Sequence, residues 1–162
     1  MWTCKSGLGA DECYRAIKPV DIGPVLSVVG RLNFISVGGS SPEKYKCDVC
    51  LASHFSPELR ALIEGLELGG ALARAVVRRL APHQSIPPHV DKWMPAEVNW
   101  RRFQIPLVTH PDILMRWPDD GVEVHLAPGF LYEVRFDRVH EVVNHTDVAR
   151  VHMQIDQVNA TI

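Results

Sequence analysis

The sequence predicts a mainly β fold of the sandwich, barrel or jelly-roll type, and two observations support this class. Short β-rich runs fill the second half of the chain, and turn-forming residues such as 118–121 and 128–129 separate most of them. No helical periodicity interrupts these runs, and such strands pack into facing sheets or a barrel. The predicted strands are 74–80, 86–91, 103–108, 113–117, 122–126, 131–136, 141–144 and 148–155.

The first half of the chain is predicted to be less regular. Residues 1–25 carry three glycines and two prolines and indicate irregular structure, whereas the branched aliphatic residues of 25–37 indicate one or two strands. One supporting helix is predicted over 57–68, where apolar residues recur at spacings of three and four. Ser56 is a suitable N-cap, and Gly69-Gly70 would end the helix.

Length and charge limit the functional classes. The 162 residues and 46% hydrophobic content predict a single domain, 1–162, with a real core. Seventeen basic residues against nineteen acidic ones give a net charge of −2. A nucleic-acid partner is therefore disfavoured, because phosphate contacts require a basic surplus.

Membrane association is also not expected. No apolar run approaches the roughly 20 residues that span a bilayer, and the first residues lack the pattern of a secretion signal. We therefore expect a cytoplasmic protein. Its four cysteines, Cys4, Cys13, Cys47 and Cys50, are expected to be reduced thiols.

A possible metal site begins with His89 and Asp91. Residues two apart on a strand point to the same face, so this His-x-Asp pair can converge on one ion. With a second histidine it would form the facial triad that holds iron(II) and leaves three positions open. A bidentate co-substrate would take two of these positions, and O2 the third. We select His140 as the third ligand.

Arg150 is the candidate co-substrate residue. If 140–144 and 148–155 form a hairpin with its turn near residue 145, His140 and Arg150 lie roughly opposite each other. A guanidinium binds a carboxylate through two parallel hydrogen bonds, which suits the far carboxylate of 2-oxoglutarate. Each residue also has an ordinary interpretation. His140 would then be a core histidine, Asp91 a solvated loop residue, and Arg150 a surface residue paired with a nearby carboxylate.

The region 74–157 resembles the aspartyl/asparaginyl β-hydroxylase family of 2-oxoglutarate oxygenases. Several stretches carry the resemblance: 86–91 (IPPHVD), 102–109 (RFQIPLVT), 126–129 (LAPG), 140–144 (HEVVN) and 150–156 (RVHMQID). They occur in the order of the family pattern, which has a proximal His often followed by x-Asp, an Arg-x-His-x-Pro-Leu strand, a Leu-x-Pro-Gly turn and a distal His. In that pattern an Asn stands four residues and an Arg ten residues after the distal His.

The resemblance implies a double-stranded β-helix, or cupin-like jelly roll, with 74–157 as catalytic core and 1–55 as a peripheral segment with strands. It implies that His89, Asp91 and His140 bind iron and that Arg150 binds 2-oxoglutarate. Arg102 would line the pocket, and Gln104 replaces the second His of the pattern, although its amide can still donate a hydrogen bond. The implied reaction uses O2 and hydroxylates an unactivated carbon of an amino acid or a peptide or protein residue.

Alternatives remain open at this stage. Cys47 and Cys50, with His54 four residues on, are half of a possible zinc site. The whole chain could instead be a cupin-like metal enzyme without 2-oxoglutarate, which would not need Arg150. It could also be a non-catalytic β-sandwich binding module in which the two histidines and the aspartate have no joint role.

Overall fold

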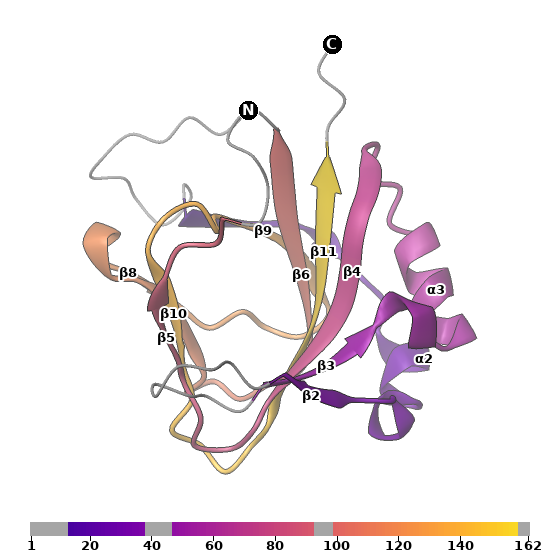
Figure 1. Ribbon diagram of the computed structural model, residues 1–162, viewed down its shortest axis with the longest axis horizontal. Coiled ribbons are helices and arrows are strands. Elements are labelled where there is room, and N and C mark those ends of the chain that lie inside the picture. The colour runs from indigo at the N-terminus through magenta and orange to yellow at the C-terminus, as the bar shows by residue number, and fades with distance from the viewer. Residues whose placement is uncertain (1–12, 38–46, 93–98, 159–162) are drawn as a thin grey trace.

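Two antiparallel sheets face each other in the computed structural model, which describes residues 13–37, 47–92 and 99–158 (Figure 1). The large sheet has the order β1 (Tyr14–Pro19), β9 (Phe130–Val134), β6 (Trp100–Val108), β11 (Arg150–Val158), β4 (Ala71–Leu80), β3 (Cys47–Leu51) and β2 (Ile35–Val37). The small sheet has the order β5 (Ile86–His89), β10 (His140–Val143), β7 (Leu114–Trp117) and β8 (Val122–Val124). Cys4 lies outside the described residues.

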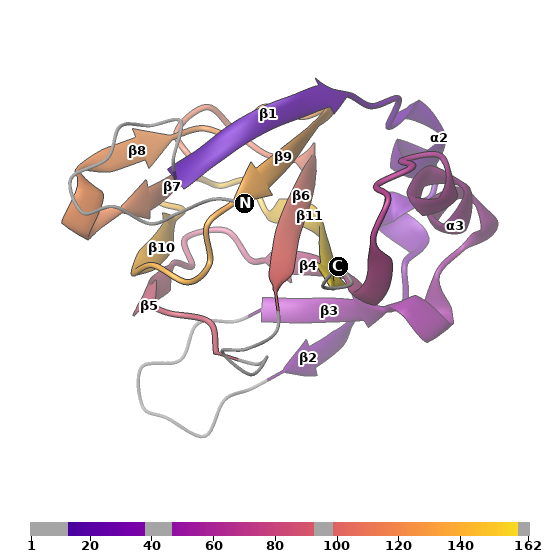
Figure 2. The ribbon, with the colours of Figure 1, turned by 90° about the horizontal axis from the view of Figure 1, so that it is seen from above.

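The helices and the small sheet lie on opposite sides of the large sheet (Figure 2). The described α-helices are α2 (Gly23–Leu26) and α3 (Pro57–Glu64). Short 3-10 turns occur at Val29–Arg31, Ala52–His54 and Pro118–Asp120. The predicted N-cap is confirmed, because the Ser56 hydroxyl accepts a hydrogen bond from the Leu59 amide at 3.4 Å. The helix stops at Gly65, earlier than predicted. None of the described helices has the length and apolar character needed to cross a membrane.

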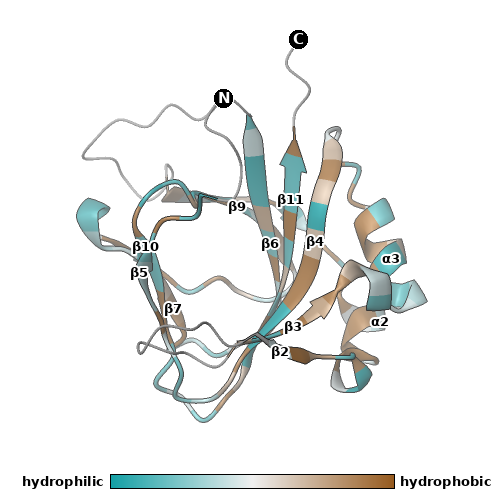
Figure 3. Cartoon of the chain, in the orientation of Figure 1, coloured by the Kyte–Doolittle hydropathy of each residue, from teal (hydrophilic) through white to brown (hydrophobic). Residues whose placement is uncertain are grey.

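The three central strands of the large sheet have one apolar and one polar face, because side chains alternate along a strand. Hydrophilic and hydrophobic segments both occur along β4 and β11 in Figure 3. The apolar faces pack with the helices in one core cluster, which includes Ala75 and Val77 of β4, Phe103, Ile105 and Leu107 of β6, and Val151, Met153 and Ile155 of β11. The polar faces point between the sheets, with Arg74 and Arg78 on β4, Arg102 and Gln104 on β6, and Arg150 and Gln154 on β11.

Apolar side chains fill the rest of the space between the sheets. Trp117 of β7 is fully buried among residues of both sheets, including Met115, Tyr132 and Val134. Its indole nitrogen donates to the Arg135 carbonyl at 2.9 Å, which ties β7 to the segment after β9. The polar cavity is thus confined to the part of the interior over β4, β6 and β11.

The topology confirms the double-stranded β-helix but shows that the expected hairpin is wrong. From β4 to β11 the chain passes back and forth between the sheets, so β10 and β11 lie in different sheets. Arg150 pairs with Leu80 rather than with His140. The buried Asn144 shapes the crossing, since its side-chain amide donates to the Val148 carbonyl at 2.9 Å and its oxygen accepts from the Thr146 amide at 3.0 Å.

Two predictions for the first half are correct only in part. Residues 25–37 are mostly helical turns, and only Ile35–Val37 forms a strand, because Pro24 starts α2 and packing buries Val25. Within the segment expected to be irregular, Tyr14–Pro19 forms β1 by pairing with β9. Both errors arise because pairing with a distant strand, rather than local composition, decides whether these segments become strands.

We predict that the apolar face of β11 dominates stability. Ile155 is fully buried, so Ile155→Ala should lower the free energy of unfolding by about 2–5 kcal/mol. Ile35→Ala is the matched control, because Ile35 lies on the edge strand β2 with 44% of its surface exposed. The control should change the unfolding free energy by less than about 1 kcal/mol. Urea denaturation followed by circular dichroism measures both, and equal effects would contradict the prediction.

Candidate active site

Two histidines face each other across neighbouring strands of the small sheet. His140, the first residue of β10, is the direct register partner of His89, the last residue of β5, and their ring centroids are 4.4 Å apart. Each Nδ1 lies 2.8 Å from a backbone carbonyl, that of Pro87 for His89 and that of Arg138 for His140. In the neutral rings Nδ1 therefore carries the hydrogen, which leaves each Nε2 with a lone pair for a metal ion.

Asp91 completes the cluster from the segment after β5. Its backbone amide donates to the Phe136 carbonyl at 3.1 Å, which fixes its position. One carboxylate oxygen lies 3.3 Å from Nε2 of His89, and the other lies 3.7 Å from Nε2 of His140. The three ligand atoms lie within 4.8 Å of one another. The strand pair and the following segment thus gather two imidazoles and one carboxylate around a common point.

This donor set fits iron(II). Two neutral imidazoles and one carboxylate form the facial arrangement of non-haem iron sites, which leaves coordination positions for other ligands. Across residues 13–37, 47–92 and 99–158 it is the one group of three such side chains close enough to share an ion. Cys47 and Cys50 are buried free thiols three positions apart on β3, so they point to opposite faces and cannot share an ion. The structure therefore does not support the zinc alternative.

The charges of the cluster depend on one another. Burial alone would raise the pKa of Asp91, but the hydrogen bond with His89 and the positive charge of Arg102 bring it well below its usual value. The same hydrogen bond, which Nε2 of the protonated ring donates, raises the pKa of His89. Burial lowers the pKa of His140. Asp91 is therefore ionised at neutral pH, as a metal ligand must be.

A network of ion pairs joins Asp91 to the large sheet. The buried Arg102 of β6 binds Asp91 and also forms two hydrogen bonds with Asp156, at 2.7 and 3.1 Å. Arg74 of β4 binds the same Asp156 carboxylate at 2.9 Å. Asp156 is fully buried, and its charge is compensated from both neighbouring strands. Arg102 is thus fixed in place and in turn fixes the carboxylate of the cluster.

Two residues further along β6, Gln104 connects two residues of β11. Its side-chain oxygen accepts hydrogen bonds from Arg150 at 3.1 Å and from Nδ1 of His152 at 2.9 Å. Because Nδ1 donates, Nε2 of His152 is unprotonated, and it has no hydrogen-bond partner among the described residues. Burial, together with the charge of Arg150, lowers the pKa of His152 well below its usual value, so the ring is neutral. The amide oxygen of Gln104 thus orients Arg150 without neutralising it.

All six residues proposed from the sequence line one cavity of about 180 Å³ between the sheets. His89, Asp91 and His140 approach from the small-sheet side, and Arg102, Gln104 and Arg150 lie on the large sheet. Arg150 therefore reaches the site although the hairpin that suggested it does not exist. The two sheets face each other, and this brings Arg150 into the cavity that the histidines also line.

Sequence reasoning did not assign several polar residues that the structure adds to this region, namely Arg74, Arg78, His152, Gln154 and Asp156. A signal for them exists. From Arg150 to Asp156, polar and apolar residues alternate strictly, which is unusual for a strand that is buried on both faces. Such a strand must have a polar partner surface, and this pattern predicts a polar cavity on one side of the sheet.

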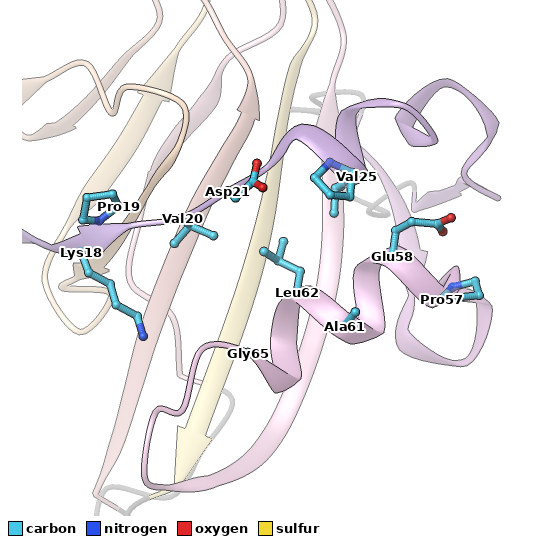
Figure 4. A pocket seen from close by; sticks show the side chains of 11 residues that line it. Lys18, Pro19, Val20, Asp21, Val25, Pro57, Glu58, Ala61, Leu62 and Gly65 are labelled. Atoms are coloured by element: carbon cyan, nitrogen blue, oxygen red, sulfur yellow. The ribbon is translucent and has the colours of Figure 1, made fainter.

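A larger cavity, of about 580 Å³, lies on the helix side of the large sheet (Figure 4). The end of β1, α2 and α3 form its walls, and Val20, Val25 and Leu62 contribute apolar side chains. The described histidines are absent from its lining. The smaller cavity is the candidate active site, because it contains the group of metal-binding type.

Comparisons with solved structures agree with this architecture. AviO1 from Streptomyces viridochromogenes Tue57 is 14% identical, with a TM-score of 0.67 and coverage of 91% of this chain and 90% of that one. The carbocyclase SnoK from nogalamycin biosynthesis is 18% identical, with a TM-score of 0.63 and coverage of 91% and 80%. A prolyl-4-hydroxylase of Pseudomonas putida is 16% identical, with a TM-score of 0.60 and coverage of 91% of each chain. At these identities the similarity establishes the fold alone.

The sequence has no significant match among curated proteins. The family model described as aspartyl/asparaginyl beta-hydroxylase, however, matches residues 49–160, which include every residue of the candidate site. The strand order, the cluster of His89, Asp91 and His140, and this match agree with the resemblance seen in the sequence. The chain belongs to the aspartyl/asparaginyl beta-hydroxylase family.

Proposed function

We propose that the protein is an Fe(II)- and 2-oxoglutarate-dependent dioxygenase that hydroxylates an unactivated carbon and releases succinate and CO2. One observation carries this proposal. The cluster of His89, Asp91 and His140 opens into the same cavity as Arg150, a buried cation without a carboxylate partner in the described part of the chain. The family match supports a hydroxylase, and two proteins of similar fold, the alpha-ketoglutarate-dependent carbocyclase SnoK and the prolyl-4-hydroxylase, agree with this chemistry.

In this proposal His89, Asp91 and His140 hold the iron. When bound, iron(II) activates O2 with 2-oxoglutarate as the source of two electrons, chemistry that no side chain supplies. The protein residues provide the geometry. The carbonyls of Pro87 and Arg138 fix the two rings with Nε2 facing the site, and Arg102 fixes the carboxylate.

Arg150 binds the far carboxylate of 2-oxoglutarate in this proposal. Its guanidinium has five N–H donors, and the hydrogen bond to Gln104 uses one of them. Burial lowers the pKa of Arg150 to about 10, so it remains charged at neutral pH. Gln104 supports Arg150 through its oxygen, and its amide N–H groups are the donors that replace the histidine of the family pattern.

Apolar side chains limit the access of water to the site. Ile86, Met115 and Val142 of the small sheet line the cavity opposite the arginines. In this proposal the apolar wall would reduce the amount of water around a reactive centre. We propose a small substrate group for this space, either a free amino acid or an Asp/Asn-type residue of a peptide or protein.

Two other functions make different predictions. A cupin-like metal enzyme that does not use 2-oxoglutarate would have no need of a buried arginine in its cavity. A binding module without catalysis would not need the two Nε2 atoms and the carboxylate to converge. The experiments below separate these possibilities from an oxygenase.

The first prediction concerns the metal. Under anaerobic conditions, wild-type protein should bind one equivalent of Fe(II) and, with 2-oxoglutarate, develop the visible metal-to-ligand charge-transfer band. His140→Ala should lose both, because it removes one of three protein ligands. His83→Ala is the control, since His83 is exposed and pairs with Asp147 on the surface. Absence of the band in folded, iron-loaded wild-type protein would exclude the oxygenase.

The second prediction concerns Arg150. Arg150→Met should weaken 2-oxoglutarate binding by about 10- to 100-fold, as expected for the loss of charge-assisted hydrogen bonds, without preventing Fe(II) binding. Titration of the charge-transfer band with 2-oxoglutarate gives the dissociation constant. Arg116→Met, on the exposed side of β7, is the control. Unchanged affinity in Arg150→Met would favour a metal enzyme without this co-substrate.

The third prediction separates orientation from charge at position 104. Gln104→Leu removes the acceptor that holds Arg150, and should weaken 2-oxoglutarate binding by about tenfold. Gln104→Glu should weaken it more, because a carboxylate beside Arg150 neutralises the guanidinium and repels the co-substrate. The same titration measures both variants. Wild-type affinity in either variant would show that Gln104 does not support Arg150.

A further inference from the structure

Of the four arginines in the cavity lining, two carry their own counter-ion. Arg74 and Arg102 both bind the fully buried Asp156, at 2.9 and 2.7 Å, and Arg102 also binds Asp91. Their positive charges are therefore largely compensated by carboxylates of the protein. Neither is well suited to attract a further anion.

Arg78 and Arg150 differ from this pair in the nature of their partners. Nε of Arg78 donates to the side-chain oxygen of Gln154 at 3.0 Å, and Arg150 donates to that of Gln104 at 3.1 Å. The two glutamines are direct register partners on β11 and β6. No carboxylate of the described residues pairs with either arginine. Each is thus held in place by a neutral amide that leaves its charge uncompensated.

The two uncompensated guanidinium groups share the same end of the cavity. They lie on the neighbouring strands β4 and β11, and both line the cavity. Cys47 of β3 is the register partner of Leu80 of β4. Burial raises the pKa of its thiol, and the nearby charges of Arg78 and Arg150 oppose that rise. After burial, the charge of Arg78 is the other factor that lowers the pKa of Arg150, to about 10. Two like charges this close are unfavourable unless an anion lies between them.

We propose that Arg78 is a second co-substrate-binding arginine, and that Arg78 and Arg150 hold one carboxylate of a dicarboxylate between them. This inference rests on the proposed function in taking 2-oxoglutarate as the natural ligand. It adds a specificity element: a 2-oxo acid without a second carboxylate leaves both charges uncompensated. The pair of arginines thus selects a dicarboxylate over a monocarboxylate, and the paired glutamines keep both guanidinium groups in place.

Glutarate is the probe that tests this pair of arginines, because it has both carboxylates of 2-oxoglutarate and lacks the keto group for chelation. Isothermal titration of the full chain under nitrogen, with and without Fe(II), measures its affinity. Arg78→Met should bind glutarate at least about tenfold more weakly than wild type, and Arg78→Lys should lie between the two. Butyrate, with a single carboxylate, should bind weakly to all of these proteins.

Arg79→Met is the matched control, because it removes the same charge at the next position. Arg79 points to the other face of β4 and pairs with Asp48 at 2.7 Å. Its glutarate affinity should equal that of wild type. Thermal unfolding establishes that each variant is folded, and if Arg78→Met is not, Arg78→Lys carries the test. Equal affinity in wild type and in the folded Arg78 variants, or no glutarate binding by wild type, would overturn the inference.

The two measurements, glutarate affinity and the charge-transfer band, distinguish failure of the inference on Arg78 from failure of the proposed oxygenase function. If wild-type protein gives no charge-transfer band but binds glutarate through Arg78, the oxygenase is excluded and the pair of arginines stands as a dicarboxylate site. If the band forms and Arg78→Met binds glutarate and 2-oxoglutarate like wild type, the oxygenase stands and the role of Arg78 is wrong.

Discussion

The site depends on three adjacent strands that must bury opposite chemistry on their two faces. On β11, Val151, Met153 and Ile155 pack into the helix-side core, while the residues between them point into the cavity. The free energy gained by apolar burial on one side fixes the register of the strands. A slip of one residue would exchange the two faces, so the same packing that stabilises the sheet also places Arg150 and Gln154.

The arginines of this interior fall into two groups, one whose charges are balanced by a carboxylate of the protein and one whose charges are not. Asp156 balances Arg74 and Arg102 near the cluster of His89 and Asp91, and the glutamines hold Arg78 and Arg150. A buried charge without a partner of opposite charge costs free energy. A ligand is therefore expected beside Arg78 and Arg150, the arginines that lack a carboxylate partner among the described residues. The arrangement separates a part of the cavity that maintains the fold from a part that is available for binding.

Much of this fold could be predicted from local patterns, because strands β4 to β11 coincide closely with β-rich runs, and Ser56 marks the start of α3. The metal-binding residues could be proposed because His89 and Asp91 are two apart in the sequence, although β5 ends at His89 and Asp91 lies in the segment after it. What local patterns cannot give is the choice of partner strand. Asn144 directs the chain into the other sheet through contacts with its own turn, and no periodicity contains that information. For the same reason Arg78 could not be recognised until β4 and β11 were paired.

The position of His89 has a mechanical consequence. β5 is the edge strand of the small sheet, and its register with β10 consists of two residue pairs, His140 with His89 and Val142 with Ile86. Edge segments with so few contacts open locally at low free-energy cost. The proposed ligands lie on both sides of this pairing, so an ion bound there would cross-link the two strands. Metal occupancy would thereby slow exchange of the amide hydrogens of Ile86 and His89, the two residues of β5 that have one, more than exchange in β11. These two amides would report locally on the metal-loaded state.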